Sequence, residues 1–326
     1  MTNSKMSKAA APPAQRPQRT FLKKTIAFVL ALIVIYFAAR QVVHSWDEVT
    51  AYPWELSVGW LILSLIGHLI TLALFSQIWC FLISGFGHQV PLKYAFKISY
   101  IASLGRYIPG KIWPVFGMAY LARQINIKEE VAVASWGIAT MFALPSAFLA
   151  GLGGVLLYPE LISEEFNIYI GGGVYIAAAV IAIVSILLVV APNRALALFN
   201  VVLRALKRPV LTFRLTIGLA IKVYLGYIIC WIAFGASFWM FLRAIIPDPH
   251  VPIVSAATAF VVAYQIGYLA FFSPGGLGVR ELTITGMLGQ YVGPIAAGIA
   301  VAARLWNLVA EFLAVLIALG IKLRKQ

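Results

Sequence analysis

Charged residues lie in the middle of apolar sequence at three places in this 326-residue chain. An ionised side chain at the centre of a bilayer costs at least about 2.5 kcal/mol unless it is paired or faces water, so these residues are functional candidates. Two of the places also contain Pro-Gly, which interrupts a helix where an interruption is expensive in lipid. They read Gly105-Arg106-Tyr107-Ile108-Pro109-Gly110-Lys111 and Ser273-Pro274-Gly275-Gly276-Leu277-Gly278-Val279-Arg280-Glu281.

The third place is a polar stripe near the C-terminus, formed by Arg304, Asn307 and Glu311 at i, i+3 and i+7 on one helix face. Arg304 and Glu311 are two turns apart, about 10 Å, which is too far for a direct ion pair. Arg280 and Glu281 are their obvious partners. Two interpretations stay open: these charges are buried ion pairs that pin the second broken segment, or Arg280 or Arg304 faces a polar cavity and holds an anionic headgroup.

The backbone around the second break favours an anion site. Its glycines can release backbone groups and allow close approach of a ligand. A helix that begins at Val279 would direct its positive N-terminal end toward that ligand, as phosphate sites require. At the first break, two readings stay open for Arg106 and Lys111. Either they lie in a turn at the level of the lipid headgroups and extend toward water, or they belong to the same anion site. The candidate substrate-binding residues are therefore Arg106, Lys111, Arg280, Glu281, Arg304, Asn307 and Glu311, and the candidate hairpin-backbone residues are Pro109, Gly110, Ser273, Pro274, Gly275, Gly276 and Gly278.

The composition is that of an all-α polytopic membrane protein. The chain is 62% hydrophobic and 11% charged, whereas soluble domains are about a quarter charged. Cys80 and Cys230 lie in apolar runs, so we interpret them as core residues. The histidines show no metal-binding spacing and no segment resembles a nucleotide-binding loop, so we expect no metal and no cofactor. The four histidines are His44, His68, His88 and His250.

The elements that position these residues are about six full transmembrane helices and two re-entrant helical hairpins. Residues 1–20 are predicted to form a disordered basic cytoplasmic tail, and residues 21–326 a single transmembrane domain. An interfacial amphipathic helix is expected at about 193–208. The crossings are expected at about 25–43, 56–83, 131–158, 168–190, 216–245 and 294–320, and the hairpins at about 92–122 and 253–290.

The charges support this topology. It places most of the 25 lysines and arginines on one side, which the positive-inside rule makes cytoplasmic together with both termini, as in an inner-membrane protein. The first hairpin then enters from the cytoplasm and the second from outside, so the halves form an inverted repeat. Aligning Pro109 with Pro274 requires an offset of 165 residues. Broken segments in matching positions of such a repeat point to the substrate site of a transporter.

The two motifs and Arg304 resemble the membrane domain of lysylphosphatidylglycerol synthases, which is shared with the UPF0104 membrane proteins and related to hopanoid-associated and AglD-type membrane domains. The likeness runs from about Lys93 to Glu311. It implies a lipid-translocating membrane domain with two re-entrant hairpins. Many relatives carry an acidic–basic pair on the helix after the first hairpin, whereas 135–139 has no charge here. We expect no aminoacyl-transferase domain after Ile321.

The expected function is a lipid translocase, either flippase or scramblase, for an anionic or phosphate-bearing lipid that moves through a groove between the hairpins. One alternative is a non-transporting subunit that binds lipid or a partner enzyme. Another is an intramembrane lipid-linked glycosyl or acyl transferase. Such chemistry needs carboxylates with a supporting base or metal, and the loop pairs 47–48 and 164–165 have none nearby, so we expect no enzyme activity. The expected partners are membrane lipids, a possible lipid-modifying enzyme and a possible second copy of the chain. Nucleic acid is not expected, because the basic excess follows one membrane face.

Overall fold

A computed structural model describes residues 43, 46–107, 112–161, 164–205, 207, 210, 214–246, 250–270 and 273–323. The predicted tail at 1–20 and nearly all of the predicted crossing at 25–43 lie outside these residues. The regular elements of the described part are helices, as predicted. They are α2 (Trp46–Ala51), α3 (Val58–Gly85), α4 (Leu92–Ser103), η1 (Leu104–Tyr107), α5 (Trp113–Arg123), α6 (Glu129–Leu157), η2 (Pro159–Leu161), α7 (Glu164–Val190), α8 (Pro192–Ala205), α9 (Ile217–Ile245), α10 (Ile253–Leu269), η3 (Pro274–Gly276), α11 (Val279–Val292), η4 (Gly293–Ile295) and α12 (Ala296–Gly320).

Four described helical stretches are long and apolar enough to cross a membrane: α3, α6, α9 and the stretch Val279–Gly320, which includes α12. A fifth is possible if residues Tyr175–Val190 of α7 form one span with α8, although the two are bent by 95°. The bend makes α8 a separate helix close to the predicted amphipathic segment at 193–208. In lipid a helix satisfies its own backbone hydrogen bonds, which is why these apolar runs fold this way.

Side-chain size decides which face of α12 turns inward. The alanines Ala303, Ala310 and Ala314 are fully buried, whereas Leu305 and Phe312 are about 60% exposed. Small residues allow helices to approach closely, and close packing is the main source of helix association in lipid. Leu305 and Phe312 are left for the acyl chains of the bilayer, while Trp306 is a large side chain that packs inside, at 4% exposed.

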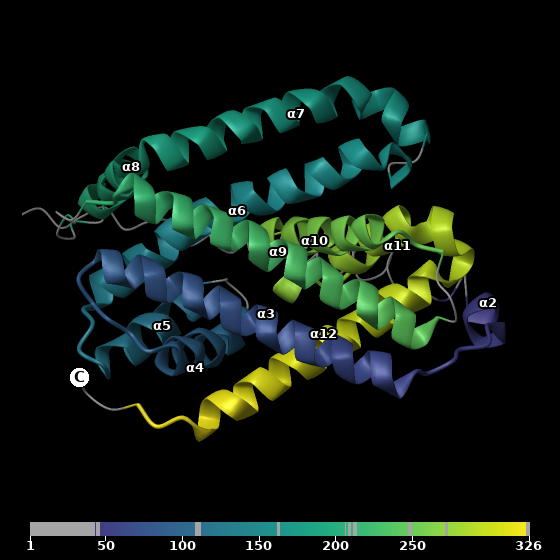
Figure 1. Cartoon of the computed structure of the whole chain (residues 1–326), viewed down its shortest axis with the longest axis horizontal. Coiled ribbons are helices and arrows are strands. Elements are labelled where there is room, and N and C mark those ends of the chain that lie inside the picture. The colour runs from purple at the N-terminus through teal and green to yellow at the C-terminus, as the bar shows by residue number, and fades with distance from the viewer. Residues whose placement is uncertain are drawn as a thin grey trace, which may run out of the picture.

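The two halves of the chain make reciprocal contacts. In Figure 1, α3 and α9 run next to each other through the middle of the molecule, and they pack together. The pair α4–α5 packs on itself, as does α10–α11; α5 then packs on α6, and α11 on α12. Across the halves, α4 contacts α12 and α10 contacts α6. The helices that make corresponding contacts begin at residues 58 and 217, 92 and 253, 113 and 279, and 129 and 296, which are offsets of 159 to 167 residues.

The helix pairs α4–α5 and α10–α11 occupy the segments for which hairpins were predicted, and each first helix begins directly after a proline, at Pro91 and Pro252. The second break has positive φ angles at Gly275, Gly276 and Gly278, of 60°, 72° and 80°. Left-handed backbone of this kind favours glycine, so the glycine-rich run is a requirement of the turn. Of the first break, Pro109, Gly110 and Lys111 lie outside the described residues. The two breaks meet, because η1 contacts η3.

The two ends of the molecule differ in charge. The α3–α4 and α5–α6 connections, α8 and the C-terminal segment lie at one end, and α2 lies at the other (Figure 1). Lys97 donates to the carbonyl oxygen of Ile321 at the first end, and the N–H of Ser57 donates to Ala244 O at the second. The described segments of the first end carry Lys93, Lys97, Arg123, Lys128, Arg194, Arg204, Lys207, Arg214, Lys222 and Lys322, besides Glu129 and Glu130; those of the second carry Asp47, Glu48, Glu55 and Glu160, with one cation, Arg243.

Candidate functional site

The first ion pair of the site joins the two halves of the chain. Arg106 of η1 lies 2.8 Å from the carboxylate of Glu311 on α12, and it also donates to the hydroxyl of Tyr264 at 3.3 Å. Asn307 donates to the same Glu311 oxygen at 3.0 Å. Glu311 therefore pairs with Arg106, which the sequence analysis did not name as a candidate partner beside Arg280 and Glu281. Arg106 lies far from α12 in the sequence, and the contact between η1 and η3 places it next to that helix.

The second ion pair is the predicted one between Glu281 of α11 and Arg304 of α12, at 3.6 Å. Arg304 also donates to the carbonyl oxygen of Gly275 at 2.9 Å. Their side chains are 11% and 12% exposed. Arg304 therefore ties α12 to the second break by two contacts, while Glu311 ties it to the first. The stripe on α12 holds both breaks in one place.

Arg280 has no such partner. Among the described residues it makes no hydrogen bond and no ion pair, and its guanidinium lies 4.0 Å from the centre of the Tyr264 ring. Its stem occupies a slot between two glycines. A Cβ at Gly267 would lie 2.4 Å from Arg280 Cγ, and one at Gly276 would lie 2.9 Å from Arg280 Nε. Only glycine leaves room for this arginine, so the backbone itself sets the position of the cation.

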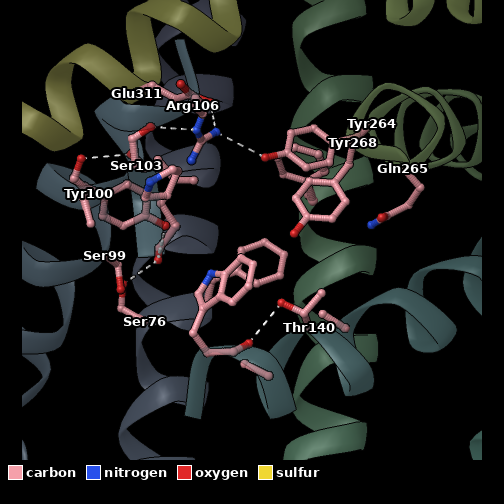
Figure 2. Close-up of a pocket in the computed structure, with 18 of the residues that line it drawn as sticks. Ser76, Ser99, Tyr100, Ser103, Arg106, Thr140, Tyr264, Gln265, Tyr268 and Glu311 are labelled. Carbon is pink, nitrogen blue, oxygen red and sulfur yellow. Dashed lines mark hydrogen bonds and ion pairs between the residues drawn. The ribbon is translucent and has the colours of Figure 1, made fainter. Parts of the chain in front are cut away.

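These charges border a cavity of about 370 Å³ between the two halves. Its walls come from α3, α4, α5, α6, α9 and α10, and most of the side chains that line them are aromatic or aliphatic. Arg106 and Glu311 lie at one end of the group of residues drawn in Figure 2. Hydroxyl-bearing residues and a glutamine line its sides, namely Ser76, Ser99, Tyr100, Ser103, Thr140, Tyr264, Gln265 and Tyr268 (Figure 2).

The structure brings most of the sequence-predicted site residues together. Those that line the cavity are Arg106, Gly275, Gly276, Arg280, Asn307 and Glu311. Glu281 and Arg304 line a small adjoining pocket of about 20 Å³. Ser273 stabilises the break itself, since its hydroxyl donates to Leu277 O at 2.7 Å. Gly278 is the N-cap of α11, and Pro274 lies in η3. The predicted residues Pro109, Gly110 and Lys111 lie outside the described residues.

Sequence reasoning missed the uncharged part of the site. The cavity hydroxyls and Gln265 lie in ordinary apolar helices, where serine and threonine commonly bond to their own backbone. Only their shared orientation after folding makes them a surface. Buried His68 packs against Phe234 and Trp306 and does not line the cavity.

The described part of the chain contains no group of three His, Cys, Asp or Glu residues able to hold a metal ion. Cys80 and Cys230 are both buried and free, as core residues would be. The groups that the cavity offers are therefore cations, hydroxyls, an amide and aromatic rings, which suit binding of a polar anionic group next to an apolar one.

Comparison with known proteins identifies the family. None of the curated proteins compared with the chain matches it. The family model described as the lysylphosphatidylglycerol synthase TM region matches residues 24–320, which is most of the chain and includes both breaks, the cavity and α12. This multi-pass membrane protein belongs to the lysylphosphatidylglycerol synthase transmembrane-region family.

Proposed function

We propose that this protein is a lipid translocase, a flippase or scramblase, that moves an anionic or phosphate-bearing lipid between leaflets and performs no covalent chemistry. The observation that carries the proposal is Arg280. It is a cation that borders a membrane-embedded cavity and has no carboxylate partner in the described structure. A charge retained at that depth without a carboxylate partner is explained by an anion that arrives with the ligand.

The shape of the cavity supports a lipid as that ligand. The cationic end is formed by Arg106 and Arg280, and the apolar walls include Trp79, Trp136 and Leu144. A phosphate would meet the arginines through charge-assisted hydrogen bonds, and arginine suits phosphate because its donors form a planar fork. Acyl chains could remain against apolar surface during the movement. Among the described lining residues one is a carboxylate, Glu311, which already accepts from Arg106 and Asn307, so a general acid–base pair has no support.

We further propose that α4–α5 and α10–α11 are re-entrant hairpins of an inverted repeat, with the basic end in the cytoplasm of an inner membrane. The reciprocal helix contacts and the nearly constant offset of 159 to 167 residues support the repeat. The segregation of lysine and arginine to one end supports the orientation. In this topology the two breaks approach from opposite faces and meet at mid-membrane, where alternating exposure of one site is possible.

Cysteine labelling tests the topology. In a variant with Cys80→Ala and Cys230→Ala, single cysteines at the exposed positions Gln89 and Gln124 should both react with an impermeant maleimide from the cytoplasmic face only. The matched control, Glu55→Cys, should react only from outside. Labelling of Gln89→Cys and Gln124→Cys from opposite faces would show that α4–α5 crosses the membrane completely, and the inverted repeat would be rejected.

Reconstitution tests the function. Purified protein in vesicles should move a fluorescent phosphatidylglycerol or polyprenyl-phosphate lipid between leaflets without ATP, as measured by dithionite quenching of the outer leaflet. Empty vesicles give the background rate. Well-folded protein that moves none of these lipids above background would favour a non-transporting subunit that binds lipid or a partner enzyme.

A further inference from the structure

Four buried polar atoms beside the second break have no hydrogen-bond partner among the described residues. They are Nε of Arg280, Oε2 of Glu281, Nε of Arg304 and Oδ1 of Asn307. The first two residues belong to α11 and the last two to α12. A buried polar group without a partner is costly, and native proteins normally satisfy such groups with protein atoms or ordered water. Four of them on two neighbouring helices therefore require an explanation.

The other polar atoms of these side chains are already engaged. Glu281 uses Oε1 for the ion pair with Arg304 at 3.6 Å, and Arg304 Nη1 also donates to Gly275 O. The Asn307 amide nitrogen donates to Glu311 at 3.0 Å. Because an ionised carboxylate only accepts hydrogen bonds, this contact fixes which end of the Asn307 amide is the nitrogen. The amide oxygen is therefore left over, and turning the amide to use it would break the bond to Glu311.

All four residues line one small pocket between α10, α11 and α12, with a volume of about 20 Å³. A buried water molecule needs a space of about 10–15 Å³ and two to four polar partners. An apolar cavity of this size stays dry, whereas a polar one holds water. The pocket therefore has the size and the polar groups of a water site. Its other lining residues are Phe260, Ala263, Tyr264, Ile284, Ala300 and Ala303.

The balance of donors and acceptors identifies the occupant. The Nε–H groups of Arg280 and Arg304 each donate one hydrogen bond, and the oxygens of Glu281 and Asn307 each accept one. A water molecule accepts two hydrogen bonds and donates two, so a single one can satisfy all four atoms. A chloride ion would leave both oxygens unpaired and would lie beside the Glu281 carboxylate. A metal cation would lie beside two guanidinium groups, which repel it.

We infer that this pocket is a binding site for one structural water molecule, which accepts from Arg280 and Arg304 and donates to Glu281 and Asn307. The water links α11 to α12 beside the second break. The slot between Gly267 and Gly276 holds the stem of Arg280, and the water holds its Nε, so both terminal nitrogens of this arginine remain available. The site does not depend on the proposed function and stands whether or not the protein moves lipid.

A structure of the purified full-length protein in lipid nanodiscs, at a resolution that shows ordered water, tests the site directly. We expect one density peak in the pocket, within about 2.7–3.2 Å of all four atoms. A map that resolves water elsewhere in the protein and shows none here rejects the site. A peak that touches Arg280 and Arg304 but neither oxygen also rejects it, because such a peak would be an anion.

Two variants of the same shape test the site by stability. Ala303 lines the pocket and is fully buried, so a larger side chain there should expel the water. Ala303→Val leaves the four atoms without a partner, whereas the hydroxyl of Ala303→Thr can take over two of the bonds. Two hydrogen bonds correspond to roughly fivefold to 150-fold in an equilibrium constant, and we expect unfolding of the valine variant to be favoured by about tenfold over the threonine variant. Reversible denaturation in mixed micelles measures both.

Ala314 provides the matched control. It lies on the same helix, is equally buried and belongs to a hydrophobic cluster with Leu72, Phe96 and Val315. Here Ala314→Thr should be no more stable than Ala314→Val. An advantage of threonine that is equal at the two positions, or absent at both, rejects the water site. If neither variant of Ala303 folds, the density in the unmodified protein decides.

Discussion

Glu311→Ala is expected to lower the free energy of unfolding by about 3 kcal/mol, because it removes the carboxylate that pairs with the Arg106 guanidinium in the membrane interior. This is the low end of the range for a broken buried pair, since the Arg106 side chain is 27% exposed and Glu311 11%. Asn307 loses its acceptor as well. Reversible denaturation of the purified protein in mixed detergent micelles measures the change.

An exposed pair of nearly the same length provides the control. Arg123 and Glu129 lie 2.9 Å apart, with side chains 67% and 50% exposed, so Glu129→Ala should cost less than about 1 kcal/mol. Arg106→Ala combined with Glu311→Ala should recover part of the loss, because no charge is then left unpaired. Equal effects of Glu311→Ala and Glu129→Ala would mean that water reaches the buried pair, and the double variant would then show no recovery.

Arg280→Ala is expected to slow lipid movement about 10- to 100-fold in vesicles. The loss of one charge-assisted hydrogen bond costs about 1.5–3 kcal/mol, which corresponds to that range of rates when the bond is made on the path across the membrane. Arg280→Lys should recover part of the rate, since it keeps the charge and loses the planar fork. Initial quenching rates at equal protein density measure the effect.

Arg243 offers a matched control for charge and for ring contact. It too lies over aromatic rings, 5.4 Å from the centres of Trp60 and Trp239, but it does not line the cavity. Arg243→Ala should leave the rate almost unchanged. If both variants slow the movement equally, the charge acts at the membrane surface and the assignment of the site to Arg280 is wrong.

The glycine slot gives an independent way to displace the same cation. Gly267→Ala places a methyl group where the Arg280 stem now lies and should slow movement nearly as much as Arg280→Ala. Gly286→Ala, on α11, is its control, because an added Cβ there has no atom within 4 Å. A normal rate in folded Gly267→Ala protein would show that the position of Arg280 is not critical.

Local signals predicted the helices well. The pairs α4–α5 and α10–α11 begin at Leu92 and Ile253, where both hairpins were predicted, and end within a few residues of the predictions. The second break was also recognisable, because proline interrupts a helix and glycine allows positive φ wherever they occur. Composition and length alone show that four or five of the described helical stretches are able to cross a membrane. The Glu281–Arg304 pair could be predicted because both partners lie on neighbouring helices joined by a short connection.

Contacts between distant segments required the tertiary structure. Arg106 and Glu311 are 205 residues apart, and nothing near either one identifies the other as its partner. Gly267 looked like an ordinary helical glycine until Arg280 was placed against it. The hydroxyl-lined wall of Ser76, Ser103 and Thr140 exists only because α3, α4 and α6 turn these side chains toward one space. The sequence alone determined which segments are helical and where they break, because those preferences are local. Packing decided which charges pair and which one, Arg280, has no carboxylate partner among the described residues, because that depends on the faces that distant helices present to each other.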